Sequence, residues 1–161
     1  MKSLRELYKI GAGPSSSHTM GPDKICRMFA SEHPNADAFT VVLYGSLAKT
    51  GKGHGTDIAI AGVAGKPVNI IFDKKNRVLP HENTMDIYSV VGGELRDKMR
   101  VMSVGGGDIE IEGREGEGAS NVYDKSSFTD ISTYCKNEGI RLSDYVFAME
   151  GEGIREFLFT V

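Results

Sequence analysis

The stretch Phe39-Thr40-Val41-Val42-Leu43-Tyr44 carries the clearest strand signal in the chain. β-Branched and aromatic residues favour extended backbone, and Gly45 ends the run. Alternating or continuous apolar runs of the same kind predict further strands at residues 68–72, 86–91, 98–104 and 109–112. Gly92-Gly93 supplies a turn between two of these strands, so neighbouring strands are expected to pair directly.

Helical periodicity, by contrast, lies mainly toward the two ends of the chain. Apolar residues recur at spacings of three and four in residues 2–9, 21–33, 126–138 and 142–149. Residues 46–65 predict one or two more helices, interrupted by glycines. Ser126 or Ser127 is expected to cap the helix at 126–138, and Gly139 to end it. Adjacent strands beside grouped helices favour an α+β fold over a doubly wound parallel sheet.

Composition limits the function classes. The 161 residues are 40% apolar and 25% charged, as in an ordinary globular protein. A net charge of −3 without any run of Lys or Arg argues against a nucleic-acid or anionic-membrane partner. No apolar stretch approaches the roughly 18 residues that span a bilayer. Arg5 and Glu6 interrupt any signal peptide, so a cytoplasmic protein is expected.

The two cysteines, Cys26 and Cys135, do not form a Cys-x-x-Cys pair. The chain alone is therefore expected to offer no zinc or iron–sulfur ligand set. In the expected compartment a disulfide is disfavoured, and both residues are interpreted as small buried side chains.

A hydroxyl-rich segment, Gly-Pro-Ser-Ser-Ser-His-Thr-Met-Gly-Pro at residues 13–22, is the strongest candidate for a functional site. Because proline fixes φ and lacks an N–H group, the flanking Gly/Pro pairs disfavour continuous helix or strand through it. The segment brings hydroxyls and an imidazole together in a short polar loop. The candidate site residues in it are Ser15, Ser16, Ser17, His18 and Thr19.

The glycine-rich stretch after the first strand is not a nucleotide-binding loop. Five residues separate Gly45 from Gly51-Lys52, where a Walker A loop has four, and Gly53 follows the lysine where Ser or Thr is required. The spacing of a dinucleotide-binding turn is missing as well.

The same stretch contains His54 and Asp57, three residues apart, with Lys52 just before them. A carboxylate bonded to one ring nitrogen would fix the tautomer and leave the other nitrogen as a base. The alternative is that Asp57 caps the following helix and His54 is a loop residue. His33 and His81, each next to a proline, are interpreted as ordinary surface residues.

Taken together, four motifs resemble the β region of the iron–sulfur-dependent L-serine dehydratases (L-serine ammonia-lyases). They are residues 10–22, residues 43–48, the Thr-Gly-Lys-Gly-His-Gly-Thr-Asp stretch at 50–57 and Ser-Val-Gly-Gly-Gly at 103–107. The resemblance implies an α+β fold with a mixed, mainly antiparallel sheet and helices packed on it. It also implies similarity to the allosteric substrate-binding domain of phosphoglycerate dehydrogenase.

The resemblance further implies a domain division. Residues 1–150 would form the β domain, and residues 151–161 a linker or the start of a catalytic α region. Glu150-Gly-Glu-Gly153 has the composition of a linker, and the apolar residues 154–161 end within a pattern, as expected of a truncated element.

The chemistry of the family follows from the resemblance alone. A [4Fe–4S] cluster, held by cysteines of the catalytic α region, leaves one iron open as a Lewis acid for the substrate carboxylate and hydroxyl. A base takes the α-proton, and L-serine becomes pyruvate and ammonia without pyridoxal phosphate. This chain by itself is expected to be inactive and to need a catalytic α domain or subunit. A homo-oligomer is also expected.

On this basis His54, as general base, and His18 are the candidate catalytic residues. The candidate substrate-binding residues are Ser15, Ser16, Ser17, Thr19, Lys52 and Asp57. Two alternatives stay open: a non-catalytic serine-binding or regulatory module, and the equivalent part of a cysteine-specific lyase.

Overall fold

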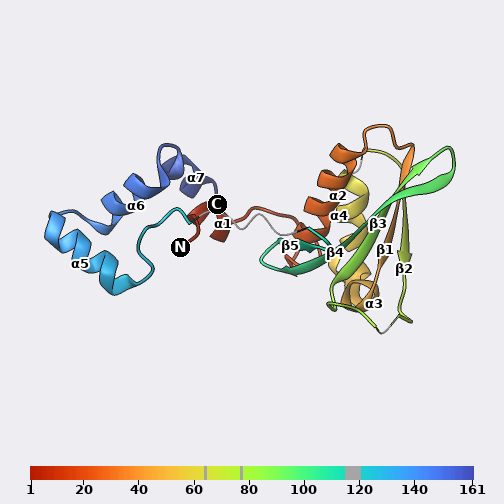
Figure 1. The fold of residues 1–161 in the computed structure, drawn as a ribbon, viewed down its shortest axis with the longest axis horizontal. Coiled ribbons are helices and arrows are strands. Elements are labelled where there is room, and N and C mark those ends of the chain that lie inside the picture. Colours follow the sequence, from red (N-terminus) through yellow and green to blue (C-terminus); the bar gives the residue numbers. More distant parts are fainter. Residues whose placement is uncertain (64, 77, 115–120) are drawn as a thin grey trace. The chain divides into compact units, whose positions relative to one another are not determined.

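The computed structural model describes residues 1–63, 65–76, 78–114 and 121–161 (Figure 1). The chain divides into two compact units. The larger unit is Gly11–Gly116, and the smaller one combines Met1–Ile10 with Glu117–Val161. The predicted division into a β domain (1–150) and a linker or start of an α region (151–161) differs from this division into units and stays a prediction.

The larger unit is built on a five-stranded sheet in the order β2-β1-β3-β4-β5. Its strands are β1 (Ala38–Leu43), β2 (Val68–Phe72), β3 (Thr84–Val91), β4 (Glu94–Gly105) and β5 (Asp108–Ile111). β1 pairs parallel with β2, whereas the other three pairings are antiparallel. The predicted α+β fold with a mixed, mainly antiparallel sheet is therefore confirmed, whereas the similarity to the phosphoglycerate dehydrogenase domain stays a prediction.

Three helices belong to this unit: α2 (Met20–Glu32), α3 (Gly45–His54) and α4 (Thr56–Val63). Helices α2 and α4 lie along one face of the sheet (Figure 1). Side chains alternate across a strand, so Phe39, Val41 and Leu43 of β1 all point to that face, and they are buried. They pack with Ile25 and Phe29 of α2 in the core of the unit.

The smaller unit contains α1 (Leu4–Leu7), α5 (Phe128–Glu138), α6 (Leu142–Glu150) and α7 (Ile154–Thr160). Its core is a separate cluster formed by Tyr123, Ile131, Cys135 and Tyr145. The Glu150 carboxylate accepts hydrogen bonds from the Ser3 hydroxyl, the Leu4 N–H and the Tyr123 hydroxyl. This carboxylate therefore joins α1 to the end of α6.

The helix and strand predictions hold, with adjusted ends. Ser127 caps α5, since its hydroxyl accepts from the Asp130 N–H at 3.1 Å, and Gly139 ends the helix at φ +65°. Residues 154–161, interpreted as a truncated element, contain the short helix α7, and the truncation stays a prediction. β4 begins four residues earlier than predicted, because Gly92 and Gly93 both adopt positive φ and close a tight hairpin.

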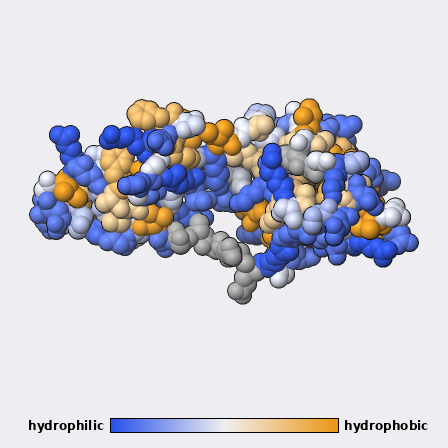
Figure 2. Space-filling model, turned by 90° about the horizontal axis from the view of Figure 1, so that it is seen from above, coloured by the Kyte–Doolittle hydropathy of each residue, from blue (hydrophilic) through white to orange (hydrophobic). Residues whose placement is uncertain are grey.

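Hydrophilic residues cover most of the visible surface, and hydrophobic ones form scattered patches (Figure 2). Isolated exposed apolar side chains are normal on globular proteins. No helix in the described part of the chain is long and apolar enough to cross a membrane.

Candidate active site

The hydroxyl-rich segment folds into a tight turn that leads into α2. The Ser15 carbonyl accepts from the backbone N–H groups of His18 and Thr19, at 3.1 and 3.0 Å, and from the Thr19 hydroxyl at 2.8 Å. Gly13 has φ +87°, and an added Cβ there would lie 2.6 Å from the Thr19 side chain. The turn therefore requires glycine at this position, and it fixes the side chains of residues 15–19.

His18 lies at the centre of this turn and is 7% exposed. Its Nδ1 lies 3.0 Å from the Ser15 hydroxyl and 3.1 Å from the Ser17 hydroxyl. Its Nε2 lies 3.2 Å from the Ser46 hydroxyl and 3.0 Å from the Thr50 hydroxyl. Four hydroxyls from two distant segments thus surround one imidazole.

These contacts also indicate the tautomer of His18. The Thr50 hydroxyl donates to the Ser46 carbonyl at 2.9 Å, so its oxygen accepts from His18 Nε2–H. Nδ1 of the neutral ring then accepts from a serine hydroxyl. Burial lowers the pKa of His18 below its ordinary value of 6.5, and the nearby His54 lowers it further. The ring is therefore neutral at pH 7.

His54 is the second imidazole of the site. Its ring centroid lies 4.6 Å from that of His18, and the two rings are tilted by 49°. The side chain is half-buried, and its ring nitrogens make no hydrogen bond to any other residue that the structure describes. His54 therefore retains a nitrogen free for proton transfer next to a neutral, fully bonded ring.

Helix α3 is the element that brings these groups together. Ser46, Thr50 and His54 occur at a spacing of four, which places them on one face of the helix. Ser46 and Thr50 were not predicted as site residues from the sequence. The signal was present, since two hydroxyls and an imidazole recur at helical spacing.

Other predicted site residues lie outside this cluster. Lys52 is exposed, with Nζ 5.4 Å from the centre of the Phe72 ring. Asp57 is the second residue of α4, and its Oδ1 accepts from the Ile58 N–H at 3.1 Å; the structure describes no hydrogen bond between Asp57 and His54. The Ser16 carbonyl accepts from the Gly21 N–H at 3.0 Å, so Ser16 contributes to the turn.

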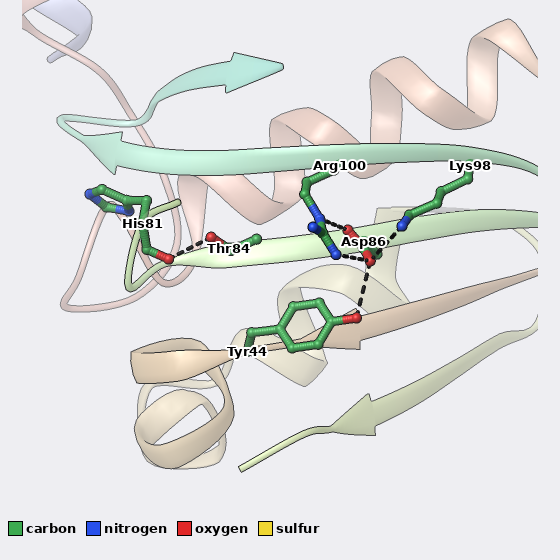
Figure 3. Close-up of polar contacts among 6 residues, drawn as sticks. All are labelled: Tyr44, His81, Thr84, Asp86, Lys98 and Arg100. Carbon is green, nitrogen blue, oxygen red and sulfur yellow. Dashed lines mark hydrogen bonds and ion pairs between the residues drawn. The ribbon is translucent and has the colours of Figure 1, made fainter. Parts of the chain in front are cut away.

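A buried carboxylate holds the start of α3. Tyr44, the N-cap residue of this helix, donates its hydroxyl to Asp86 Oδ2 at 3.0 Å (Figure 3). Arg100 donates to both carboxylate oxygens at 2.7 and 2.8 Å, and Lys98 Nζ lies 3.1 Å from Oδ2. Asp86 itself is 1% exposed. The residue before α3 is therefore tied to β3 and β4.

The charges within this network are well defined. Burial raises the pKa of Asp86, but the hydrogen bonds from Arg100, Lys98 and Tyr44 outweigh burial and lower the pKa overall. Burial and the Asp86 charge raise the pKa of Tyr44 to about 12. Asp86 is thus an anion and Tyr44 a protonated donor at neutral pH.

The side chains that the structure describes do not fit an iron–sulfur cluster. Across the described residues, no group of three His, Cys, Asp or Glu side chains could hold a metal ion. Cys26 and Cys135 are both buried, in the separate cores of the two units. Burial, with a smaller contribution from Asp23, raises the pKa of the Cys26 thiol to about 12, so it stays protonated.

The sequence of this chain, including the site, is similar to known proteins. A sequence model of the family described as "Serine dehydratase beta chain" matches residues 3–69, which include the hydroxyl-rich turn and all of α3. L-serine dehydratase 1 of Escherichia coli (strain K12) is 35% identical over 94% of this chain and 43% of its own length. L-serine dehydratase of Haemophilus influenzae is 31% identical over 93% of this chain and 43% of its own length.

A relative whose name designates a beta chain matches too. The probable L-serine dehydratase beta chain of Bacillus subtilis is 38% identical over 62% of this chain and 53% of its own length. This chain spans less than half the length of the Escherichia coli and Haemophilus influenzae relatives. The comparisons confirm the resemblance that the motifs predicted: this chain is of the L-serine dehydratase beta type.

Proposed function

We propose that this chain is the β part of a pyridoxal-phosphate-independent L-serine ammonia-lyase, which converts L-serine to pyruvate and ammonia. One observation carries the proposal: a buried neutral His18, held by four hydroxyls, lies beside a half-buried His54 whose ring nitrogens bond no other described residue. The names of the relatives support the substrate, since they are designated L-serine dehydratases.

In this proposal the two imidazoles have different roles. His18 cannot readily accept a further proton, because both of its nitrogens are bonded and burial disfavours its charged form. It positions the site and packs against the His54 ring. His54 takes the α-proton of serine on its free nitrogen.

The electron pair left at Cα then forms the Cα–Cβ double bond, and the β-hydroxyl leaves as water, taking up one proton for the one that His54 has accepted. The resulting aminoacrylate tautomerises to an imine. Water hydrolyses the imine to pyruvate and ammonia, so the water lost in the first step is regained in the last.

The [4Fe–4S] cluster belongs to the proposal but not to this chain. The side chains described here do not fit it, so its ligands are assigned to a catalytic α domain or subunit outside this sequence. The short span of the chain relative to its relatives supports such a partner. The chain alone is then inactive.

The test is to produce the chain anaerobically together with a catalytic α region and to measure pyruvate release from L-serine. We expect His54→Ala to lower kcat about 10²-fold or more, the usual effect of losing a general base. His33→Gln is the matched control. It removes an imidazole from the opposite end of α2, where Nδ1 contacts the Phe29 carbonyl.

Each outcome has a distinct meaning. Near-normal turnover by His54→Ala would eliminate the base assignment. A wild-type assembly that releases no pyruvate from L-serine overturns the proposed activity. Faster pyruvate release from L-cysteine than from L-serine indicates the cysteine-specific alternative.

A further inference from the structure

The loop His81–Asn83, directly before β3, is tied to both sides of the candidate site. On one side, the Ser46 N–H in the first turn of α3 donates to the Glu82 carbonyl at 2.7 Å. On the other side, the Ser103 N–H donates to the Asn83 carbonyl at 3.0 Å, and the Asn83 side-chain amide donates to the Ser103 carbonyl at 3.3 Å. The loop therefore bridges α3 and the end of β4.

Both anchors also contact the segment that carries His18. The Ser46 hydroxyl bonds His18 Nε2, and the Ser103 side chain lies so close to Gly21 that an added Cβ on Gly21 would overlap it. Gly21 follows His18 by three residues. The loop, α3 and the hydroxyl-rich turn thus form one continuous polar end of the sheet.

His81 is held as a hydrogen-bond donor of fixed direction. Its Nδ1 accepts from the Asn83 N–H at 3.0 Å, so the neutral ring carries its proton on Nε2. The fully buried Thr84 hydroxyl donates to the His81 carbonyl. Figure 3 shows the ring projecting from the loop, away from the Asp86 network. His81 is half-buried and anchored, which the interpretation as an ordinary surface residue did not anticipate.

The Nε2–H group of His81 makes no hydrogen bond to any other residue in the described part of the chain. Two buried oxygens at the base of the loop, Asn83 Oδ1 and Ser103 Oγ, also lack a partner among the described atoms. Buried polar atoms normally find a partner, in protein, water or ligand. These atoms therefore indicate that a water molecule, a ligand or another protein group binds at this end of the sheet.

We propose that His81 is a further substrate-binding residue, whose Nε2–H donates to the carboxylate of an amino acid bound at the His18–His54 pair. Arg100 and Lys98 bind Asp86, so these two cations already have a carboxylate partner. An imidazole with a fixed tautomer is a neutral donor that can bind a carboxylate. The inference rests on the proposed function, since the ligand is its substrate.

Two variants separate the donor from the loop anchor. In His81→Asn the side-chain oxygen can still accept from the Asn83 N–H, but no donor reaches the position of Nε2. In His81→Gln the longer amide places a donor near that position. In the assembled enzyme, we expect His81→Asn to raise KM for L-serine about 10- to 100-fold, the effect of losing a hydrogen bond to a charged group. The change in kcat should be smaller, and His81→Gln should restore much of the affinity.

The contradicting results are equally specific. An unchanged KM in His81→Asn, or equal KM values in the two variants, overturns the inference while leaving the proposed function intact. A wild-type assembly without pyruvate release overturns the proposed function instead. If the assembly is inactive, or if His81→Asn does not fold, ¹⁵N NMR of the His81 ring in the wild-type chain alone tests the inference. A proton on Nε2 supports the inference, and a proton on Nδ1 overturns it.

Discussion

The three histidines of the candidate site differ in how many of their ring nitrogens already have a hydrogen-bond partner. His18 has partners at both ring nitrogens, His81 at one, and His54 at neither within the described part of the chain. A ring with two partners is a structural and positioning group, whereas a ring with a free nitrogen can exchange a proton or bind a ligand. The three imidazoles therefore differ in how many ring nitrogens could bind a ligand or exchange a proton.

At the same scale, substitution of Asp86 should cost much stability. We expect Asp86→Asn to lower the free energy of unfolding by about 3 kcal/mol, because it leaves Arg100 and Lys98 without the carboxylate between them. Glu94→Gln is the control, since its ion pair with Arg96 is exposed and should matter by less than about 0.5 kcal/mol. Urea unfolding of the chain measures both, and equal effects would contradict the role of the network.

The stability effect of Asp86→Asn should depend on pH. The folded protein holds the pKa of Asp86 below its ordinary value of 3.8, so the unfolded chain binds this proton more readily. The contribution of Asp86 is therefore fully present at neutral pH and is lost as pH falls below about 4. The stability difference between wild type and Asp86→Asn should shrink between pH 5 and pH 3. A difference that stays constant over this range would contradict the assignment.

Among the elements, α3 decides the geometry of the site. It begins at Gly45, which follows the Tyr44 anchor, and carries three site side chains at a spacing of four. Gly45 has φ +50°, and an added Cβ would overlap the Glu82 carbonyl oxygen. Only glycine satisfies both conditions, because L side chains disfavour this backbone region.

Two glycines of α3 therefore predict opposite results. Gly45→Ala should destabilise the protein by about 2 kcal/mol or more, through backbone strain and the displaced loop at Glu82. An added Cβ at Gly53 in the same helix has no atom within 4 Å. Gly53→Ala should therefore raise the free energy of unfolding by about 0.5–1 kcal/mol, because alanine favours helix. Thermal and urea unfolding of both variants test this. If both variants were more stable than the wild type, the start of α3 would tolerate a side chain at residue 45.

On the scale of the whole chain, stability is divided between two cores. The core of the larger unit contains residues from α2 to β4, whereas that of the smaller unit uses Tyr123 and residues of α5 and α6. We expect a fragment of residues 11–116 to fold alone, because it contains its sheet, its core and the Asp86 network. A single cooperative urea transition, with strand signal in circular dichroism, is the expected result. A fragment without such a transition would show that its core depends on the rest of the chain.

The sequence by itself determined the elements, the mixed α+β class and the position of the main motif. Strand and helix periods are local properties, and the Gly/Pro pairs around residues 15–19 limit the backbone there whatever surrounds it. The helices at 21–33, 126–138 and 142–149 were therefore predictable to within a few residues, as was the cap at Ser127.

Only the tertiary structure decided which of the polar residues meet. Asp57 is close to His54 in sequence but bonds its own helix, whereas Ser46 and Thr50 reach His18 across about 30 residues. The Asp86 network carries no local signal, since Tyr44, Lys98 and Arg100 come from other parts of the chain. Pairing of this kind follows from sheet register and from the packing of α3, which no single stretch of sequence encodes.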